Sequence, residues 1–307
     1  MLSKEFPILE NLSNKLIYSE AQDNNDKNEN YKYDKLVLYD LSKGERIYLS
    51  DGNSLTKEGI ISNDLNKITL LSAINNDPIL QKIQGVGADL FFYEYSLEIK
   101  QWICLIEKED LNKNNVSTRI NHINYNNNGN ILFSTYGKIF QYDFIDKKMI
   151  ELFVINNNYH IDNFNCNYNN KLFLIQYSNE NDWNDTGIMI YSLEKDSVLV
   201  KISPKSLGTE IGNFSPNNKN ICYLDSAITI FNIENNIYKN VTVKNNDKII
   251  KPIKCKFLNE KELIIIASYK HQIQDAFDVF KYNLLTKELL QITNDRKYKD
   301  YLFCNYN

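Results

Sequence analysis

The chain has 307 residues, of which 43% are hydrophobic, and its 35 Lys and Arg against 39 Asp and Glu give a net charge of −4. This apolar share is enough for a folded core, and the charge balance disfavours a nucleic-acid partner, which would need clustered Lys and Arg. No stretch approaches the ~18 consecutive apolar residues of a membrane span, and the first residues lack the apolar run of a secretory signal. We therefore expect a cytoplasmic protein, or an extracytoplasmic one if a leader has been removed.

Six segments along the chain share one pattern: a strand of period two that carries an aromatic residue, a short polar turn, and a second strand. They cover residues 36–49, 90–105, 138–153, 188–202, 228–243 and 278–293. The recurrent aromatic residues are Tyr39, Tyr93, Tyr142, Tyr191, Phe231 and Tyr282. Each segment predicts a β-hairpin.

A second pattern precedes each hairpin. An apolar residue and an aromatic residue, separated by one residue, lead into an Asn-rich turn and a very apolar strand. Examples are "INYNNNGNILFSTY" from Ile123 and "CNYNNKLFLIQY" from Cys166. Fainter copies begin at Pro7 and Ile60. Two hairpins per unit make four antiparallel strands that recur every ~45 to 60 residues, which is the size of a propeller blade.

The chain ends on one more copy of the first strand, "YLFCNYN", with no hairpin after it. Because an open ring would leave unpaired strand edges, we expect this strand to pair with the N-terminal strands and close the ring. The prediction is a single all-β domain over residues 1–307: a six-bladed β-propeller of four-stranded antiparallel blades, with seven blades as the alternative. The expected blades cover approximately 1–50 with 299–307, 58–105, 118–154, 160–203, 209–244 and 250–294.

The five cysteines are an odd number without CxxC spacing, which favours reduced thiols over a disulfide framework or a zinc site. Cys166, Cys255 and Cys304 fall at one place in the repeat, where other blades have Ile123 and Gly212. Since free cysteine behaves as a small buried hydrophobe, we expect these three thiols to pack in the core of the innermost strands.

Two segments, "NFSPNNKNICYLDSAITIFNIEN" and "LLQITNDRKYKDYLF", resemble the repeat of the TolB-like propellers. Blades of that family run from a Leu-Thr-Asn-Asp phrase into Ser-Pro-Asp-Gly, a short apolar strand and a Tyr-Asp-Leu hairpin. Here residues 292–295 match the first phrase and residues 215–216 the second. Asn217 and Asn218 replace Asp-Gly, and Asn also adopts turn and left-handed conformations. The resemblance implies a TolB-like six-bladed fold; it does not by itself imply a function.

In such a propeller the joins between the second and third strands of each blade lie on one face, together with the connections between blades. Four of these joins are predicted to be long loops, at residues 20–34, 73–89, 178–187 and 268–277. Long loops on a rigid scaffold often carry binding residues. We therefore place any binding site on this face, which we call the loop face.

The candidate ligand-binding residues come from these loops and the strands beside them. Trp183 is an aromatic residue among polar ones and could anchor a partner or cover its own blade. The complete candidate set is Tyr177, His160, Asp182, Trp183, Tyr269, His271 and Asp275.

Two of the loops also carry acidic residues that could hold a hard cation such as Ca²⁺ or attract a basic peptide. These residues are Asp23, Asp26, Glu29, Glu180, Asp182 and Asp185. Neither loop has the EF-hand order of ligands, so no metal site and no cofactor is predicted.

Two functions stay open. The favoured one is a monomeric, non-catalytic scaffold that presents the loop face to a protein or peptide, a basic peptide included; the chain has no GxSxG, HExxH, P-loop or nucleotide-binding Gly motif. The alternative is a metal-assisted hydrolase or lyase that acts on a glycan or a small ester at the central channel. Catalysis would require residues such as His160, His271, Asp182 and Asp275 to meet at the channel mouth.

A glycan-binding platform is a variant of the first function and would make a different demand. It needs aromatic side chains arrayed across one face, for which Tyr177, Trp183 and Tyr269 are the candidates.

Overall fold

The computed structural model describes residues 9–21, 34–50, 52, 55–72, 91–106, 108–117, 119–144, 146–156, 158–169, 171–204, 209–245, 248–269, 277–299 and 301–304. Among these residues, no helix is long and apolar enough to cross a membrane.

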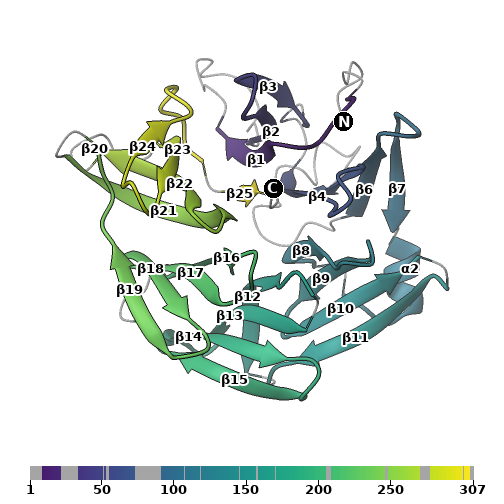
Figure 1. The fold of residues 1–307 in the computed structure, drawn as a ribbon. Coiled ribbons are helices and arrows are strands. Elements are labelled where there is room, and N and C mark those ends of the chain that lie inside the picture. The colour runs from purple at the N-terminus through teal and green to yellow at the C-terminus, as the bar shows by residue number, and fades with distance from the viewer. Residues whose placement is uncertain are drawn as a thin grey trace, which may run out of the picture.

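The strands form six antiparallel sheets, the blades, around a common axis (Figure 1). From the axis outward, blade 1 contains β25 (Leu302–Cys304), β1 (Lys15–Glu20), β2 (Lys35–Asp40) and β3 (Glu45–Tyr48). Blade 2 contains β4 (Thr56–Ile61), β5 (Lys67–Ser72), β6 (Phe91–Ser96) and β7 (Trp102–Ile106). A short helix, α2 (Lys108–Lys113), leads to blade 3, with β8 (His122–Tyr125), β9 (Ile131–Thr135), β10 (Lys138–Asp143) and β11 (Lys148–Val154).

The remaining blades follow in chain order. Blade 4 contains β12 (Tyr159–Cys166), β13 (Leu172–Asn179), β14 (Asp182–Ser192) and β15 (Ser197–Ile202). Blade 5 contains β16 (Glu210–Phe214), β17 (Asn220–Asp225), β18 (Ala227–Asn232) and β19 (Ile237–Val241). Blade 6 contains β21 (Lys248–Asn259), β22 (Glu262–Tyr269), β23 (Asp278–Asn283) and β24 (Leu289–Gln291), and the short β20 (Lys244–Asn245) pairs with the start of β21. The prediction of six four-stranded blades is confirmed, and the seven-bladed alternative is not adopted.

The ring closes through the last strand. β25 pairs antiparallel with β1, with Leu16 opposite Cys304 and Tyr18 opposite Leu302. As predicted, the C-terminal strand pairs with the N-terminal blade and becomes its innermost strand, so that the inner edge of β1 is covered.

The Thr-Asn-Asp phrase before β25 ties blade 6 to blade 1. The Thr293 hydroxyl donates to Asp278 at 3.1 Å, which holds the exit from blade 6. Asp295 then pairs with Arg46 of blade 1 at 2.8 Å and with the fully buried Lys299 at 2.5 Å. The residues that carry the family resemblance therefore help to close the ring.

The hydrophobic core is divided among the gaps between blades. Each of six buried clusters joins two neighbouring blades, including one that joins blade 6 to blade 1. Twisted sheets packed face to face bury both of their surfaces, which explains why the second strand of each blade is largely buried on both faces.

The repeated hairpin pattern has a local physical cause. A polar residue directly after the aromatic accepts N–H groups of the turn through its side-chain oxygen, a geometry that Asp, Asn and Ser favour. These residues are Asp40, Ser96, Asp143, Ser192, Asn232 and Asn283. In blade 2 the turn residue is Ser96, so the equivalent aromatic is the buried Tyr95 and the sequence-based choice of Tyr93 was wrong. Both tyrosines lie on the same side of β6, two residues apart, and period two cannot separate them.

Cys166, Cys255 and Cys304 are buried as predicted, but they do not share one place in the repeat. Cys166 and Cys304 each donate the thiol to a carbonyl near the end of the innermost strand of the preceding blade, Tyr125 at 3.6 Å and Phe257 at 3.1 Å. Cys255 lies two residues before Phe257 and belongs to another position. The alignment was wrong because apolar residues recur at both positions on the buried side of these strands.

One predicted loop is a hairpin. Residues 178–187 continue β13 and β14, and only Glu180 and Asn181 form the turn. Across the two strands Tyr177 lies against Gly187, where a side chain would collide with its ring. The other three long joins fall mostly outside the described residues.

Candidate binding sites on the loop face

The central channel is lined by alternate residues of the innermost strands. Because neighbouring strands are antiparallel, these strands begin at the loop face, and a cavity of about 130 Å³ lies there. Each blade contributes to its wall: Tyr301 from blade 1, Lys57 and Glu58 from blade 2, His122 from blade 3, Asn163 from blade 4, Glu210 from blade 5 and Lys254 from blade 6. The channel is therefore a polar site that the ring geometry assembles from distant parts of the chain.

Opposite charges pair around the channel wall. Glu58 is 4% exposed; it bonds His122 through one carboxylate oxygen and accepts the N–H of Ile123 at 2.9 Å through the other. Burial alone would raise the pKa of Glu58, but His122, Lys57 and the Ile123 N–H outweigh it and lower that pKa below its usual value. Farther round, Lys254 pairs with Glu210 at 2.7 Å.

A second polar cluster lies in blade 4 and contains the candidate His160. Its Nε2 is 2.8 Å from Asp162 and 2.9 Å from Ser178, whose hydroxyl donates to Asp162 at 2.8 Å. In a catalytic triad the serine and the aspartate bind opposite nitrogens of the histidine, whereas here both bind the same one. Ser178 is also only 4% exposed. Burial, as the largest cause, raises the pKa of Asp162. The cluster holds β12 against β13 and does not present an accessible nucleophile.

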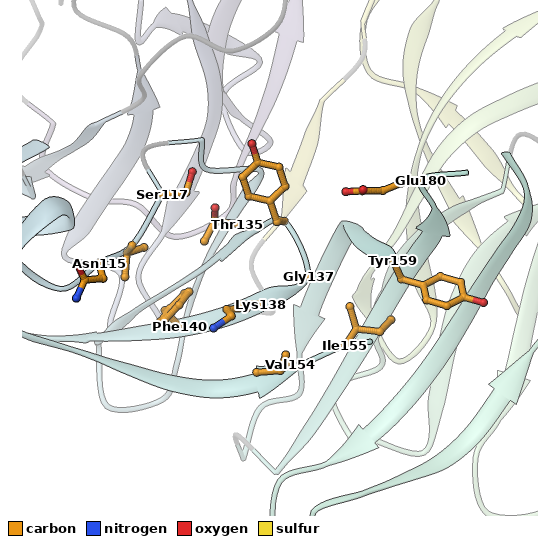
Figure 2. Close-up of a pocket in the computed structure, with 12 residues that line it drawn as sticks. Asn115, Ser117, Thr135, Gly137, Lys138, Phe140, Val154, Ile155, Tyr159 and Glu180 are labelled. Carbon is orange, nitrogen blue, oxygen red and sulfur yellow. The ribbon is translucent and has the colours of Figure 1, made fainter. Parts of the chain in front are cut away.

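A larger cavity of about 370 Å³ lies between blades 3 and 4, and we call it the Gly137 groove (Figure 2). It is lined by Asn115, Val116, Ser117, Thr135, Tyr136, Gly137, Lys138, Phe140, Val154, Ile155, Tyr159 and Glu180. Tyr136 and Val154 are 46% and 47% exposed, so apolar surface is open to a partner. Only glycine fits at position 137, since a Cβ atom there would lie 2.8 Å from Ile155 Cγ2 and 2.9 Å from the Tyr159 carbonyl.

The polar groups of the Gly137 groove differ in how well they are satisfied. Lys138 pairs with Glu151 at 2.6 Å. Glu180 is exposed, makes no ion pair with any described residue, and points toward the space over Gly137 (Figure 2). Thr135 is 3% exposed, and its hydroxyl has no hydrogen-bond partner within the described part of the chain.

The other predicted site residues are placed as follows. Tyr177 packs edge-on against Tyr159, with ring centroids 5.5 Å apart. Asp182 accepts two hydrogen bonds from Asn184 in its own turn. The side chains of Trp183 and Tyr269, and all of His271 and Asp275, lie outside what the structure describes.

The acidic residues of blade 4 also bond within their own hairpin. Tyr159 donates to Asp185 at 2.6 Å and Asn179 donates to it at 3.0 Å, and these bonds lower the pKa of Asp185. Among the described residues, no group of three or more His, Cys, Asp or Glu side chains is placed to hold a metal ion.

The sequence interpretation missed the residues that line the two cavities. A signal for the channel was present: polar residues alternate with buried ones in "HINY", "NFNC" and "KCKF" on three innermost strands. The Gly137 groove had no such signal, because its lining comes from short connections of unlike sequence.

The fold can be compared with solved structures. TolB from Acinetobacter baumannii matches with a TM-score of 0.67 at 12% sequence identity, over 95% of this chain and 66% of that one. The chain has a TolB-like propeller fold. It thus spans less than two thirds of the length of that TolB, and at this identity the likeness concerns the fold alone.

A second match is an oligogalacturonate lyase in complex with manganese, with a TM-score of 0.54 at 10% identity, over 91% of this chain and 72% of that one. No family model and no curated protein sequence matches this TolB-like chain. Since a lyase shares the architecture, function has to be argued from the sites.

Proposed function

We propose that this chain is a non-catalytic, monomeric binding propeller, and that the Gly137 groove holds an extended segment of a partner protein. The observation that carries the proposal is an open cavity of about 370 Å³ on the loop face that combines exposed apolar side chains with unsatisfied polar ones. Binding sites on rigid scaffolds typically have this composition, an apolar surface with a few polar groups that fix orientation.

The lining of the groove indicates the chemistry of the segment. Val116, Phe140 and Ile155 form an apolar floor suited to one aliphatic or aromatic side chain of the partner. Glu180 stands at one end with no cation to neutralise it among the described residues. We therefore expect a Lys or Arg of the segment beside Glu180, which agrees with a basic peptide as partner.

Thr135 supplies a further reason for a peptide. A buried hydroxyl without a hydrogen bond costs about 1–3 kcal/mol. Thr135 lines the groove, so we expect that, after rotation about χ1, its hydroxyl donates to a main-chain carbonyl of the bound segment. Binding would thus remove the free-energy cost of the unsatisfied hydroxyl in the free protein.

The scaffold is favoured over a metal-assisted hydrolase or lyase by the geometry of the polar clusters. Ser178 is buried and bonded to Asp162, and the charged groups of the channel wall are largely paired with one another. A catalytic base or nucleophile needs access to a substrate, and neither described cluster offers it.

The test measures fluorescence anisotropy of two labelled peptides of about eight residues, one alternating Val with Lys and one alternating Val with Glu. We expect the Val-Lys peptide to bind at least roughly tenfold more tightly, and Val154→Asn, which removes apolar surface without adding charge, to weaken that binding by roughly tenfold. The matched control is Val198→Asn, which changes a similarly exposed valine on the outer strand of blade 4 and should leave binding intact. Equal binding of both peptides, no saturable binding, or equal effects of the two valine variants would contradict the proposal.

A further inference from the structure

The channel wall carries more positive charge than the protein as a whole. The chain has a net charge of −4, yet three lysines and two glutamates line the channel cavity. Lys57 comes from blade 2, and Lys254 and Lys256 come from blade 6. The three lysines therefore reach the channel cavity from the two blades on either side of blade 1.

Two of these lysines, Lys57 and Lys256, are not held in an ion pair by either glutamate. Glu210 is already paired with Lys254, and Glu58 with His122. Lys57 and Lys256 are half-buried, and neither makes an ion pair or hydrogen bond with any residue that the structure describes. Partly desolvated cations of this kind are costly unless an anion comes near them.

Unused amide groups lie beside these lysines. Asn124 accepts the N–H of Tyr125 at 2.8 Å through its oxygen, which leaves its NH₂ group for the channel. The side chain of Asn165 makes no hydrogen bond within the described residues. Asn124, Asn165 and Lys256 line both the 130 Å³ cavity and a smaller one of about 40 Å³ beyond it. These three residues therefore meet where the two cavities join.

The size of the cavity limits the ligand. The channel cavity, at about 130 Å³, is only about a third of the Gly137 groove, at about 370 Å³, so it suits a small ion better than a peptide or an oligosaccharide. Two lysines act as point charges, and amide N–H groups add directed hydrogen bonds to oxygen. We infer that the central channel binds a small dianion, inorganic phosphate or a short dicarboxylate, between Lys57 and Lys256 with the amides of Asn124 and Asn165. This site shares no residue with the Gly137 groove and does not depend on the function proposed there.

The test is titration calorimetry of the whole chain with inorganic phosphate and, separately, with succinate, at constant ionic strength set with chloride. The protein should bind one equivalent of at least one of the two anions, and the tighter of them identifies the source of the dianion. Lys256→Met should lower that affinity at least roughly tenfold. The matched control Lys148→Met changes an exposed lysine on β11 and should leave the affinity unchanged.

A second variant separates lost binding from lost folding. Asn165→Asp places a carboxylate beside Lys256, so the variant should fold, shown by an undiminished unfolding temperature, and bind neither anion. No binding of either anion by the unaltered protein would overturn the inference. Equal weakening by Lys148→Met and Lys256→Met, or full affinity in Asn165→Asp, would overturn it too.

Discussion

The central channel and the Gly137 groove share one face but arise in opposite ways. The channel is built from equivalent positions of the innermost strands, so every blade contributes to it. The groove is built where neighbouring blades differ: the join in blade 3 is only Tyr136 and Gly137, while the β13–β14 hairpin of blade 4 extends to Glu180. The channel, built from repeated positions, is small and charged, and both of its glutamates are paired. The Gly137 groove, built where the repeat is broken, is larger and partly apolar.

The comparison also separates stability from binding. The paired residues of the channel wall, Glu58 with His122 and Glu210 with Lys254, hold neighbouring blades together, so we expect their substitution to change the free energy of unfolding. Groove residues such as Val154 and Glu180 have few partners, so their substitution should change ligand binding and leave stability nearly intact.

The largest effect is expected at a buried glycine of the innermost strand of blade 5. In Gly212→Ala the new methyl group would collide with the Cys222 sulfur and with the Cys255 carbonyl on the next blade. Overpacking against main chain should lower the free energy of unfolding by about 3 kcal/mol, measured by urea denaturation. Gly129→Ala is the control: it has positive φ but open space, and should lose only about 1 kcal/mol. Similar losses in both variants would show that the blades are less tightly packed there than described.

The next effect concerns the two carboxylates of the loop face. Glu58→Gln removes a charge that is hydrogen-bonded in a buried site, and should cost about 2 kcal/mol at neutral pH. The folded-state pKa of Glu58 is lowered, so its contribution to stability is present above the unfolded pKa near 4.5 and is lost as pH falls through the folded pKa.

The contribution of Asp162 to stability should change with pH in the opposite direction. Its folded-state pKa is raised above 3.8, so the unaltered protein loses stability relative to Asp162→Asn as pH rises from 3.8 through the folded pKa. Urea denaturation of both variants between about pH 3 and pH 7 would show opposite slopes of the stability difference. Slopes of the same sign would refute the assigned environments.

A smaller effect, an increase in stability instead of a decrease, is expected in the groove. Thr135→Val replaces the unpaired hydroxyl with a methyl group of similar shape, and should raise the free energy of unfolding by about 1 kcal/mol. The same variant should bind the Val-Lys peptide more weakly, because the hydroxyl can no longer donate to it. Calorimetric unfolding and peptide anisotropy would test both results, and a loss of stability would mean that the hydroxyl has a partner in the free protein.

Much of the fold follows from the sequence because its causes are local. Period-two strands, a buried aromatic such as Tyr142 and a turn-holding polar residue such as Asp143 recur in every blade, and they fix the number and type of the sheets. The prediction was wrong about register, that is, about which residue of a strand occupies which position of the repeat. Tyr93 and Tyr95 lie on one side of the same strand, and only the hydrogen bonds of Ser96 decide between them.

The sites were harder to predict than the fold. Glu58 and His122 are 64 residues apart in sequence, and only the angle between neighbouring blades brings them together. Residues 178–187 looked like a loop because polar residues on both faces normally indicate one. A two-stranded ribbon that projects from a blade has solvent on both faces, so it accepts the same composition.

The most direct test of the proposed function is a charge exchange at position 180. In the unaltered protein, the Val-Lys peptide should bind at least roughly tenfold more tightly than the Val-Glu peptide, and in Glu180→Lys that preference should reverse. Such a reversal, with an unfolding temperature unchanged by the substitution, would locate the peptide in the Gly137 groove beside residue 180. If Glu180→Lys keeps the preference of the unaltered protein, the groove is not where the partner binds.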